Sequence, residues 1–288
     1  MTAILAPLRG VTVKSFRAAF AREIKAARFC ESVTPFITAV QGYDPLKDRE
    51  LSSEGEEPVP VVPQFIGKDP AALEHCLERI KDAGYDRADL NCGCPFPMVR
   101  KKFRGSGIMK TPDILAKMTE TGVKIMGEGR FSVKMRLGVD SPGEILSVLP
   151  VLNRFPLKWI TVHARTAKQM YSGVCDMAAF DAAVAASSNK IIYNGDAPFP
   201  PETARPGAAG TMIGRSFVIH LGTLENIRDL LERYAEISIR ELCGDRPALG
   251  RLKELASYWK DLPGWKRRWP VLKISRTVGE FLSAASLF

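Results

Sequence analysis

The chain has 288 residues, 45% hydrophobic and 25% charged, a composition typical of a globular protein that excludes a disordered or fibrous one. Lysine and arginine number 41 against 32 aspartate and glutamate residues, and the resulting net charge of +9 favours an acidic partner such as nucleic acid. Residues 1–9 carry no charged leader and no apolar run could span a bilayer, so we expect no signal peptide, no membrane partner and a cytoplasmic location.

Short β-rich segments alternate with amphipathic helical stretches through most of the chain. The predicted strands are residues 3–7, 29–33, 59–65, 87–91, 131–135, 159–163, 190–194 and 210–214. Helices are predicted between them, for example over residues 71–83, 112–126 and 178–186. Eight such units are typical of a (β/α)8 TIM barrel. An open doubly wound sheet would normally carry a glycine-rich phosphate turn after its first strand, and none follows residue 7, so the barrel is favoured.

Two regions depart from the strand–helix alternation. Residues 196–210 contain four prolines, which predicts an abbreviated turn in place of a seventh helix. Beyond residue 221 the β-rich segments stop, and residues 224–242, 248–261 and 273–286 have helical patterns. We therefore predict two domains, a barrel over residues 1–222 and a small helical domain over residues 223–288.

The six cysteines give no sign of a metal site. Cys92 and Cys94 are separated by one residue, whereas a zinc knuckle needs two, and the other four cysteines are scattered singly. Such usage is also ordinary for a reducing compartment, so neither a bound metal nor a disulfide framework is predicted.

Polar residues follow the predicted strands where their apolar patterns end. These residues are Gln64, Asn91, Cys94, Lys134, Arg136, His163, Asn194, Gly195, Asp196, Gly214 and Arg215. A TIM barrel gathers its active site at this end of its strands, and a buried strand end has no structural need for so many polar groups. A lone histidine is more often a satisfied core residue, but the strand-end context of His163 favours contact with a ligand.

The turn at residues 91–95, Asn-Cys-Gly-Cys-Pro, holds a thiol and an amide beside a basic loop that contains Lys101, Lys102 and Arg104. A fixed thiol next to this loop predicts catalysis on a negatively charged substrate.

Lys134 and Arg136 are two residues apart on one strand, so their side chains leave it on the same face. Two adjacent cations call for an anion or an electron-rich ring. The glycine-bearing turns after the seventh and eighth strands lie where this fold commonly binds phosphate. Together these features predict a pocket for a phosphorylated, electron-accepting ring, which FMN fits.

Basic and aromatic residues alternate over residues 259–269, a composition that suits phosphate contact and base stacking. We predict that Lys266, Arg267 and Arg268 contact RNA. The tryptophans of this segment fit packing against the barrel equally well.

The sequence resembles the tRNA-dihydrouridine synthases along nearly its whole length. The matching segments are residues 6–12 (APLRGVT), 90–95 (LNCGCP), 133–138 (VKMRLG), 161–166 (TVHART), 169–173 (QMYSG), 194–196 (NGD), 212–215 (MIGR) and, in the tail, 258–264.

This resemblance implies an FMN enzyme that reduces the C5=C6 bond of uridines in tRNA to 5,6-dihydrouridine, with NADPH reducing the flavin. It implies that Cys94 is the general acid that protonates C5. The residues implied to bind the cofactor are Pro7, Leu8, Gln64, Lys134, His163, Asn194, Gly195, Asp196, Gly214 and Arg215. The residues implied to bind the substrate are Asn91, Arg136, Arg165 and Tyr171, together with Lys101, Lys102, Arg104, Lys266, Arg267 and Arg268. We expect a monomer.

One departure from the family pattern bears on the acid. Cys92 occupies a position that commonly holds Met or another bulky residue, so a pocket-facing Cys92 would weaken the assignment to Cys94. Two other functions stay open: an FMN-dependent reductase of another RNA or of a free pyrimidine, and a non-catalytic RNA-binding barrel.

Overall fold

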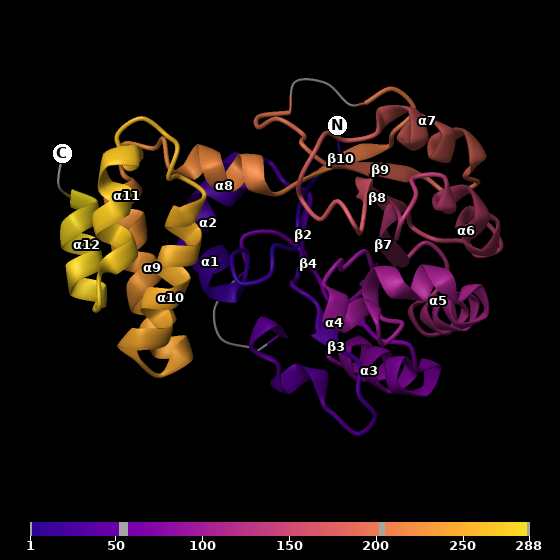
Figure 1. Cartoon of the computed structure of the whole chain (residues 1–288). Coiled ribbons are helices and arrows are strands. Elements are labelled where there is room, and N and C mark those ends of the chain that lie inside the picture. The colour runs from indigo at the N-terminus through magenta and orange to yellow at the C-terminus, as the bar shows by residue number, and fades with distance from the viewer. Residues whose placement is uncertain (1, 52–56, 202–204, 287–288) are drawn as a thin grey trace.

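The computed structural model describes residues 2–51, 57–201 and 205–286, and it consists of a barrel of parallel strands followed by a helical tail (Figure 1). The strands are β1 (Thr2–Leu5), β2 (Glu31–Val33), β3 (Ile37–Thr38), β4 (Val61–Val62), β5 (Gln64–Ile66), β6 (Ala88–Cys92), β7 (Phe131–Gly138), β8 (Ile160–Thr166), β9 (Ile191–Asn194) and β10 (Gly210–Ile213).

The strands occupy eight positions around a closed barrel. β2 and β3 are two parts of one extended segment, as are β4 and β5, which only Pro63 separates. β2 pairs with β4 and β3 with β5, β5 pairs with β6, and β10 pairs with β1, so the ladder returns to its start. The predicted (β/α)8 barrel is confirmed. The single strand predicted over residues 59–65 is split because proline has no N–H to donate to the ladder.

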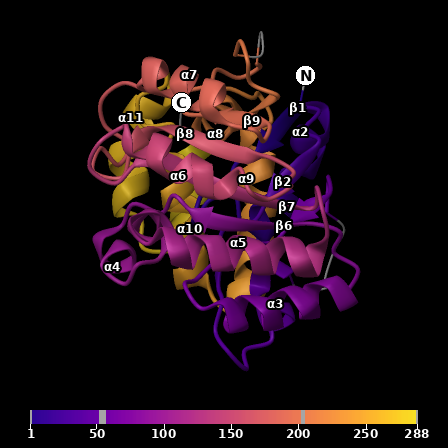
Figure 2. The same ribbon diagram turned by 90° about the vertical axis from the view of Figure 1, so that its right-hand side faces the viewer.

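Helices cover the outside of the barrel. They are α1 (Lys14–Ala19), α2 (Ala21–Ala26), α3 (Pro70–Asp82), α4 (Pro97–Arg100), α5 (Pro112–Met126), α6 (Glu144–Leu152), α7 (Met177–Ala186) and α8 (Arg215–Leu221), with 3-10 turns at Pro45–Lys47, Arg49–Leu51 and Gly105–Lys110. Figure 2 shows α3, α5 and α6 side by side over the strands, with the tail helices on the far side. The described residues between β9 and β10 form no helix, as their prolines predict.

Apolar side chains close the barrel at the end away from the carboxyl ends of its strands. One buried cluster joins Ile4, Val33, Val62, Ile192 and Met212, which come from five strands, to Trp159, which lies just before β8. The inward positions toward the carboxyl ends of the strands are mainly polar, and buried polar side chains also lie near the starts of β6 and β7, at Asp89 and Ser132. The interior is therefore filled at one end and open at the other.

The tail consists of α9 (Ile227–Leu242), α10 (Asp245–Ser257), α11 (Trp265–Ile274) and α12 (Val278–Ser286), which lie against α1, α2 and α8 (Figure 1). Trp259 and Trp265 are buried at this junction, where their indole nitrogens donate to the carbonyls of Val218 at 2.6 Å and Gly222 at 2.7 Å. The tryptophans therefore pack against the barrel. The start predicted for the helix over residues 273–286 was wrong. Residues 265–274 form a separate helix, and the next helix begins at Val278.

Candidate active site

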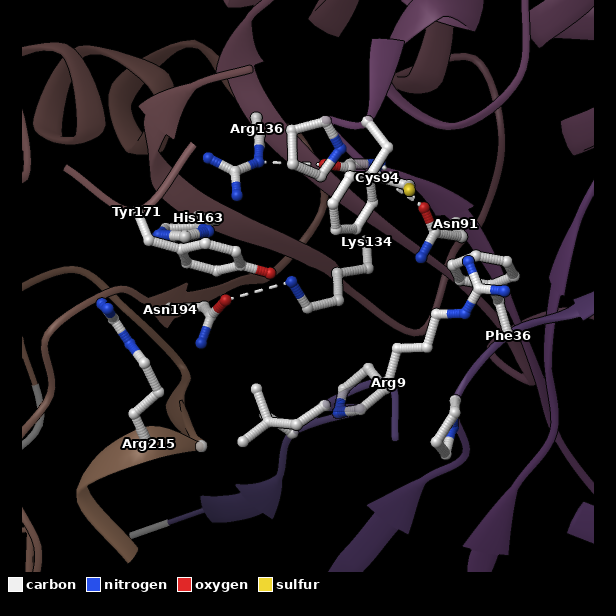
Figure 3. Close-up of a pocket in the computed structure, with 18 of the residues that line it drawn as sticks. Arg9, Phe36, Asn91, Cys94, Lys134, Arg136, His163, Tyr171, Asn194 and Arg215 are labelled. Carbon is white, nitrogen blue, oxygen red and sulfur yellow. Dashed lines mark hydrogen bonds between the residues drawn. The ribbon is translucent and has the colours of Figure 1, made fainter. Parts of the chain in front are cut away.

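A pocket opens at the carboxyl end of the barrel, where the strand-end residues predicted it (Figure 3). It encloses about 780 Å³, including the part open to solvent. Its lining residues include Pro7, Leu8, Arg9, Phe36, Asn91, Cys94, Phe96, Lys134, Arg136, His163, Tyr171, Asn194, Gly195, Gly214 and Arg215.

The thiol of Cys94 is held by a turn that Asn91 organises. Asn91 Oδ1 accepts hydrogen bonds from the backbone nitrogens of Gly93 at 3.2 Å and Cys94 at 2.9 Å. Burial raises the pKa of the Cys94 thiol, and the nearby cations, with Arg9 foremost among them, only partly oppose this effect. The thiol is therefore protonated at neutral pH and can donate a proton into the pocket.

Cys92 does not compete for this role. Its side chain is completely buried in the apolar cluster between the strands and the helices, and it is not among the lining residues. A pocket-facing Cys92 would have weakened the assignment of the general acid to Cys94, and Cys92 does not face the pocket.

A chain of buried hydrogen bonds supports the turn on its side away from the pocket. Asn91 Nδ2 donates to Gln64 Oε1 at 2.7 Å, Gln64 Nε2 donates to Asp89 Oδ1 at 2.7 Å, and Ser132 Oγ donates to Asp89 Oδ2 at 2.7 Å. These bonds fix which end of the Asn91 amide faces the turn. Gln64, predicted to contact the cofactor, is fully buried beneath Asn91 and is not a lining residue.

Lys134 and Arg136 lie in the pocket with no carboxylate paired to either within the described residues. Lys134 Nζ donates to Asn194 Oδ1 at 3.0 Å, and burial followed by repulsion from Arg136 lowers its pKa to about 8. Burial likewise lowers the pKa of Arg136 to about 10. Two cations that lack counter-charges attract an anion or a ring that gains electrons.

Arg136 also ties three segments of the site together. Its Nε donates to the carbonyl of Gly93 at 2.9 Å, and its Nη1 donates to the carbonyls of Thr166 at 2.9 Å and Met170 at 2.7 Å. The guanidinium thus links the Cys94 turn to the loop after β8.

An aromatic pair forms one wall of the pocket. Tyr171 lies between the guanidinium groups of Arg136, at 5.4 Å, and Arg215, at 5.2 Å, and is 46% exposed. Beside it His163 is nearly buried, and burial together with the surrounding cations lowers its pKa far below its usual range. His163 is therefore neutral in this site at physiological pH.

Two residues predicted to touch ligands instead support this wall. Arg165 pairs with Asp196 and donates to the carbonyls of Ser172 at 3.2 Å and Gly173 at 2.6 Å. Asp196 also accepts from Arg215 at 2.6 Å. Neither Arg165 nor Asp196 is a lining residue.

The remaining predicted substrate residues lie outside the pocket. Lys101 and Lys102 are exposed just after α4 with Arg104 half-buried beyond them, and Lys266 and Arg267 are exposed on α11, where Arg268 lies over Trp265 at 5.4 Å. Conversely, Arg9 and Phe36 line the pocket although the sequence did not indicate a role for them. The position of Arg9 inside the matched segment 6–12 was the available signal.

The residues that line the pocket suit a flat, phosphorylated ring. Pro7 and Leu8 supply an apolar surface, Lys134 and Arg215 supply positive charge, and a Cβ at Gly214 would come within 3.1–3.3 Å of Ala6 and Leu8. The described residues contain no cluster of three or more His, Cys, Asp or Glu side chains suited to a metal ion. Nor does any helix in that part of the chain have the length and hydropathy to cross a membrane.

Comparison with known proteins agrees with this geometry. Residues 4–219 match the family model described as dihydrouridine synthase (Dus). A probable tRNA-dihydrouridine synthase of Rhodobacter capsulatus is 30% identical over 221 residues, 74% of this chain and 66% of that protein. The tRNA-dihydrouridine synthase B of Vibrio cholerae is 29% identical over 220 residues, with the same coverage of each chain. The match thus spans slightly less than two thirds of these relatives.

Solved structures show the same barrel. Morphinone reductase superposes with a TM-score of 0.53 at 12% identity, covering 76% of this chain and 83% of the other. The old yellow enzyme homologue from Zymomonas mobilis gives a TM-score of 0.53 at 12% identity, with 75% and 85% covered. At this level of identity the likeness concerns the fold.

Proposed function

Because the chain belongs to the dihydrouridine synthase family, we propose that its pocket binds FMN and reduces the C5=C6 bond of uridines in tRNA to 5,6-dihydrouridine, with NADPH as the reductant. The observation that carries the proposal is one pocket that combines a protonated thiol, Cys94, with two desolvated cations, Lys134 and Arg136.

Bound FMN would supply the hydride for C6 of the uracil, and NADPH would recharge it. Lys134 would stabilise negative charge on the ring, against the apolar surface of Pro7 and Leu8. Neutral His163, with the turns at Gly195 and Gly214 and with Arg215, would hold the ribityl phosphate.

The uracil would lie between Cys94 and the aromatic wall. The amide of Asn91, the guanidinium of Arg136 and the ring of Tyr171 would hold it in plane. The thiol proton of Cys94 would pass to C5, and the thiolate left behind would be stabilised by the cations that face it, Arg9, Arg136 and Lys134. Gln64 and Asp89 would keep Asn91 oriented from below.

The target uridine must leave the RNA stack to reach this pocket. We propose that Lys101, Lys102 and Arg104 contact phosphates at its border. We propose further that residues 223–288 form the tRNA-binding part of the chain, with Lys266, Arg267 and Arg268 on α11 as its contacts. The basic composition of both segments supports this assignment.

The test is to incubate the purified protein with NADPH and tRNA that lacks dihydrouridine, and to quantify dihydrouridine in the digested tRNA by mass spectrometry. Release of FMN on denaturation and NADPH-dependent product would support the proposal. A flavin-containing protein that modifies no tRNA but reduces free uridine monophosphate or ribosomal RNA would contradict the tRNA assignment.

A further inference from the structure

The pocket has a second wall, opposite Tyr171 and Arg215, that the proposed chemistry does not use fully. Figure 3 shows Arg9 and Phe36 there, across the pocket from that pair and on the same side as Asn91. The guanidinium of Arg9 lies over the ring of Phe36 at 5.2 Å. We call Arg9 and Phe36 the aromatic shelf.

The charge of Arg9 is available to a ligand. Its side chain is exposed, and among the described residues it makes no hydrogen bond and no ion pair with a carboxylate. An exposed guanidinium stacked on an aromatic ring offers a phosphate two or more N–H donors and offers a base a flat surface. This combination is what single-stranded RNA requires.

The backbone under Arg9 is held firmly. Leu8 N donates to Thr12 Oγ1 at 2.7 Å, and Thr12 Oγ1 donates to the carbonyl of Ala6 at 2.8 Å. From the tail, Arg251 Nη1 of α10 donates to the carbonyl of Gly10 at 2.8 Å. A ligand that meets Arg9 therefore meets a positioned cation and not a free surface side chain.

We propose that the aromatic shelf binds the nucleotide adjoining the target uridine, with Arg9 on its phosphate and Phe36 against its base. The inference rests on the proposed function. A uridine withdrawn from its stack brings its neighbours to the mouth of the pocket, and the shelf is a cationic and aromatic surface of that mouth opposite Tyr171.

The test compares Arg9→Gln and Phe36→Leu with two matched controls in the flavin-loaded protein. Arg130→Gln removes an exposed guanidinium just before β7, at the opposite end of the barrel, and Phe155→Leu trims a half-buried ring just before β8. Each variant is assayed for flavin content, for NADPH oxidation with oxygen as acceptor, and for tRNA binding at several salt concentrations. The variant Arg9→Lys keeps the positive charge and so tests whether charge alone is enough for tRNA binding.

We expect Arg9→Gln and Phe36→Leu to weaken tRNA binding about 5- to 30-fold, because a stacked base or a phosphate contact contributes about 1–2 kcal/mol. Arg9→Gln should also reduce the slope of log affinity against log salt by about one, whereas Phe36→Leu should leave that slope unchanged. NADPH oxidation should stay at the wild-type rate in Phe36→Leu, and Arg9→Lys should restore the salt slope but not the full affinity.

Unchanged tRNA affinity in both variants would overturn the inference, as would lost flavin with normal tRNA binding, which would make the shelf a cofactor wall. Both results are distinct from failure of the proposed function, in which the wild-type protein itself makes no dihydrouridine.

Discussion

At the scale of one residue, Lys134 shows that the pocket lowers the free energy of unfolding of the protein. Its amine is desolvated beside Arg136, and its pKa falls to about 8 from 10.5. Between these values the unfolded chain binds more protons than the folded one, so the free energy of unfolding rises with pH across that window. Below pH 8 the cost of the buried charge is fully present. A bound anion would offset it.

We therefore expect Lys134→Met to stabilise the flavin-free protein at neutral pH by about 1–2 kcal/mol, since each tenfold change in a protonation constant is worth about 1.4 kcal/mol and pocket solvent screens part of the effect. The gain should shrink as the pH approaches 10.5. Urea denaturation at neutral and alkaline pH measures it. Lys117→Met, on the exposed face of α5, is the control. A destabilised variant would show that the lysine is not strained in the free pocket.

The same substitution should weaken FMN binding, because the positive charge facing the ring is removed. Titration of flavin fluorescence measures the affinity, and about a tenfold loss is expected. In the wild type the affinity should fall as pH rises through 8, whereas in the methionine variant it should be flat. An equal pH dependence in both proteins would assign the titration to another group.

The sequence predicted many of the residues that line this pocket but not their individual contacts. Alternation along a strand predicted that Lys134 and Arg136 share a face, and both line the pocket. Gln64 and Arg165 follow the same alternation, yet they support neighbours from outside the lining. Depth along a strand and the identity of a hydrogen-bond partner depend on three-dimensional register, which a single sequence does not carry.

At the scale of elements, two helical glycines differ in the space around them. Gly122 of α5 lies so close to Phe131 of β7 that a Cβ would come within 2.2 Å of its ring. Gly250 of α10, by contrast, has nothing within 4 Å of the same position. An added methyl group would therefore clash at Gly122 but would have room at Gly250.

Gly122→Ala should lower the free energy of unfolding by about 1–3 kcal/mol, because the ring and the helix must move apart. Gly250→Ala should raise it by about 0.5–1 kcal/mol through helix propensity alone. Thermal or urea unfolding of the two variants side by side tests the contrast. Equal effects would mean that α5 does not approach β7 as closely as the structure has it.

The contact of α10 with the β1–α1 loop joins the tail to the pocket. Arg251 donates to the Gly10 carbonyl, and a Cβ at Gly10, where φ is +82°, would meet the carboxylate of Glu254 at 2.5 Å. The sequence predicted the helices of the tail, but nothing in residues 248–261 indicated this contact, because it joins segments more than two hundred residues apart. The start of the separate α11 was missed for a related reason, because it depends on tertiary packing. The split at Pro63 has a local cause, since proline has no N–H to donate to the ladder.

Arg251→Ala should accelerate hydrogen exchange in residues 7–13 and weaken FMN binding several-fold, since one hydrogen bond from a charged donor is worth about 1.5–3 kcal/mol. Arg246→Ala, an exposed residue on the same helix, is the control. Exchange and FMN affinity matching those of the control would show that the tail does not shape the pocket.

At the scale of the whole molecule, the net charge suits a polyanionic partner. The net charge is +9, and the basic segments after α4 and on α11 belong to the barrel and the tail respectively. The composition predicted an acidic partner. It could not predict which surfaces meet it, because charge counts carry no positions.

A double substitution, Lys266→Gln with Arg267→Gln, should reduce the slope of log tRNA affinity against log salt by about two and leave the flavin content unchanged. Lys117→Gln with Lys124→Gln, on exposed positions of α5, removes the same charge away from the tail. If the α5 pair weakens binding as much as the α11 pair, net charge and not the tail surface determines RNA binding.

The most direct test of the central claim is the yield of dihydrouridine in tRNA from Cys94→Ala and Cys92→Ala, each with its flavin content measured. The two thiols are two residues apart, one in the pocket and one in the apolar core. We expect Cys94→Ala to keep its flavin and to lose activity by about 10²–10⁴-fold, as expected for a general acid, while Cys92→Ala stays close to the wild type. Full activity without Cys94, or a flavin-loaded Cys92→Ala that is equally inactive, would contradict it.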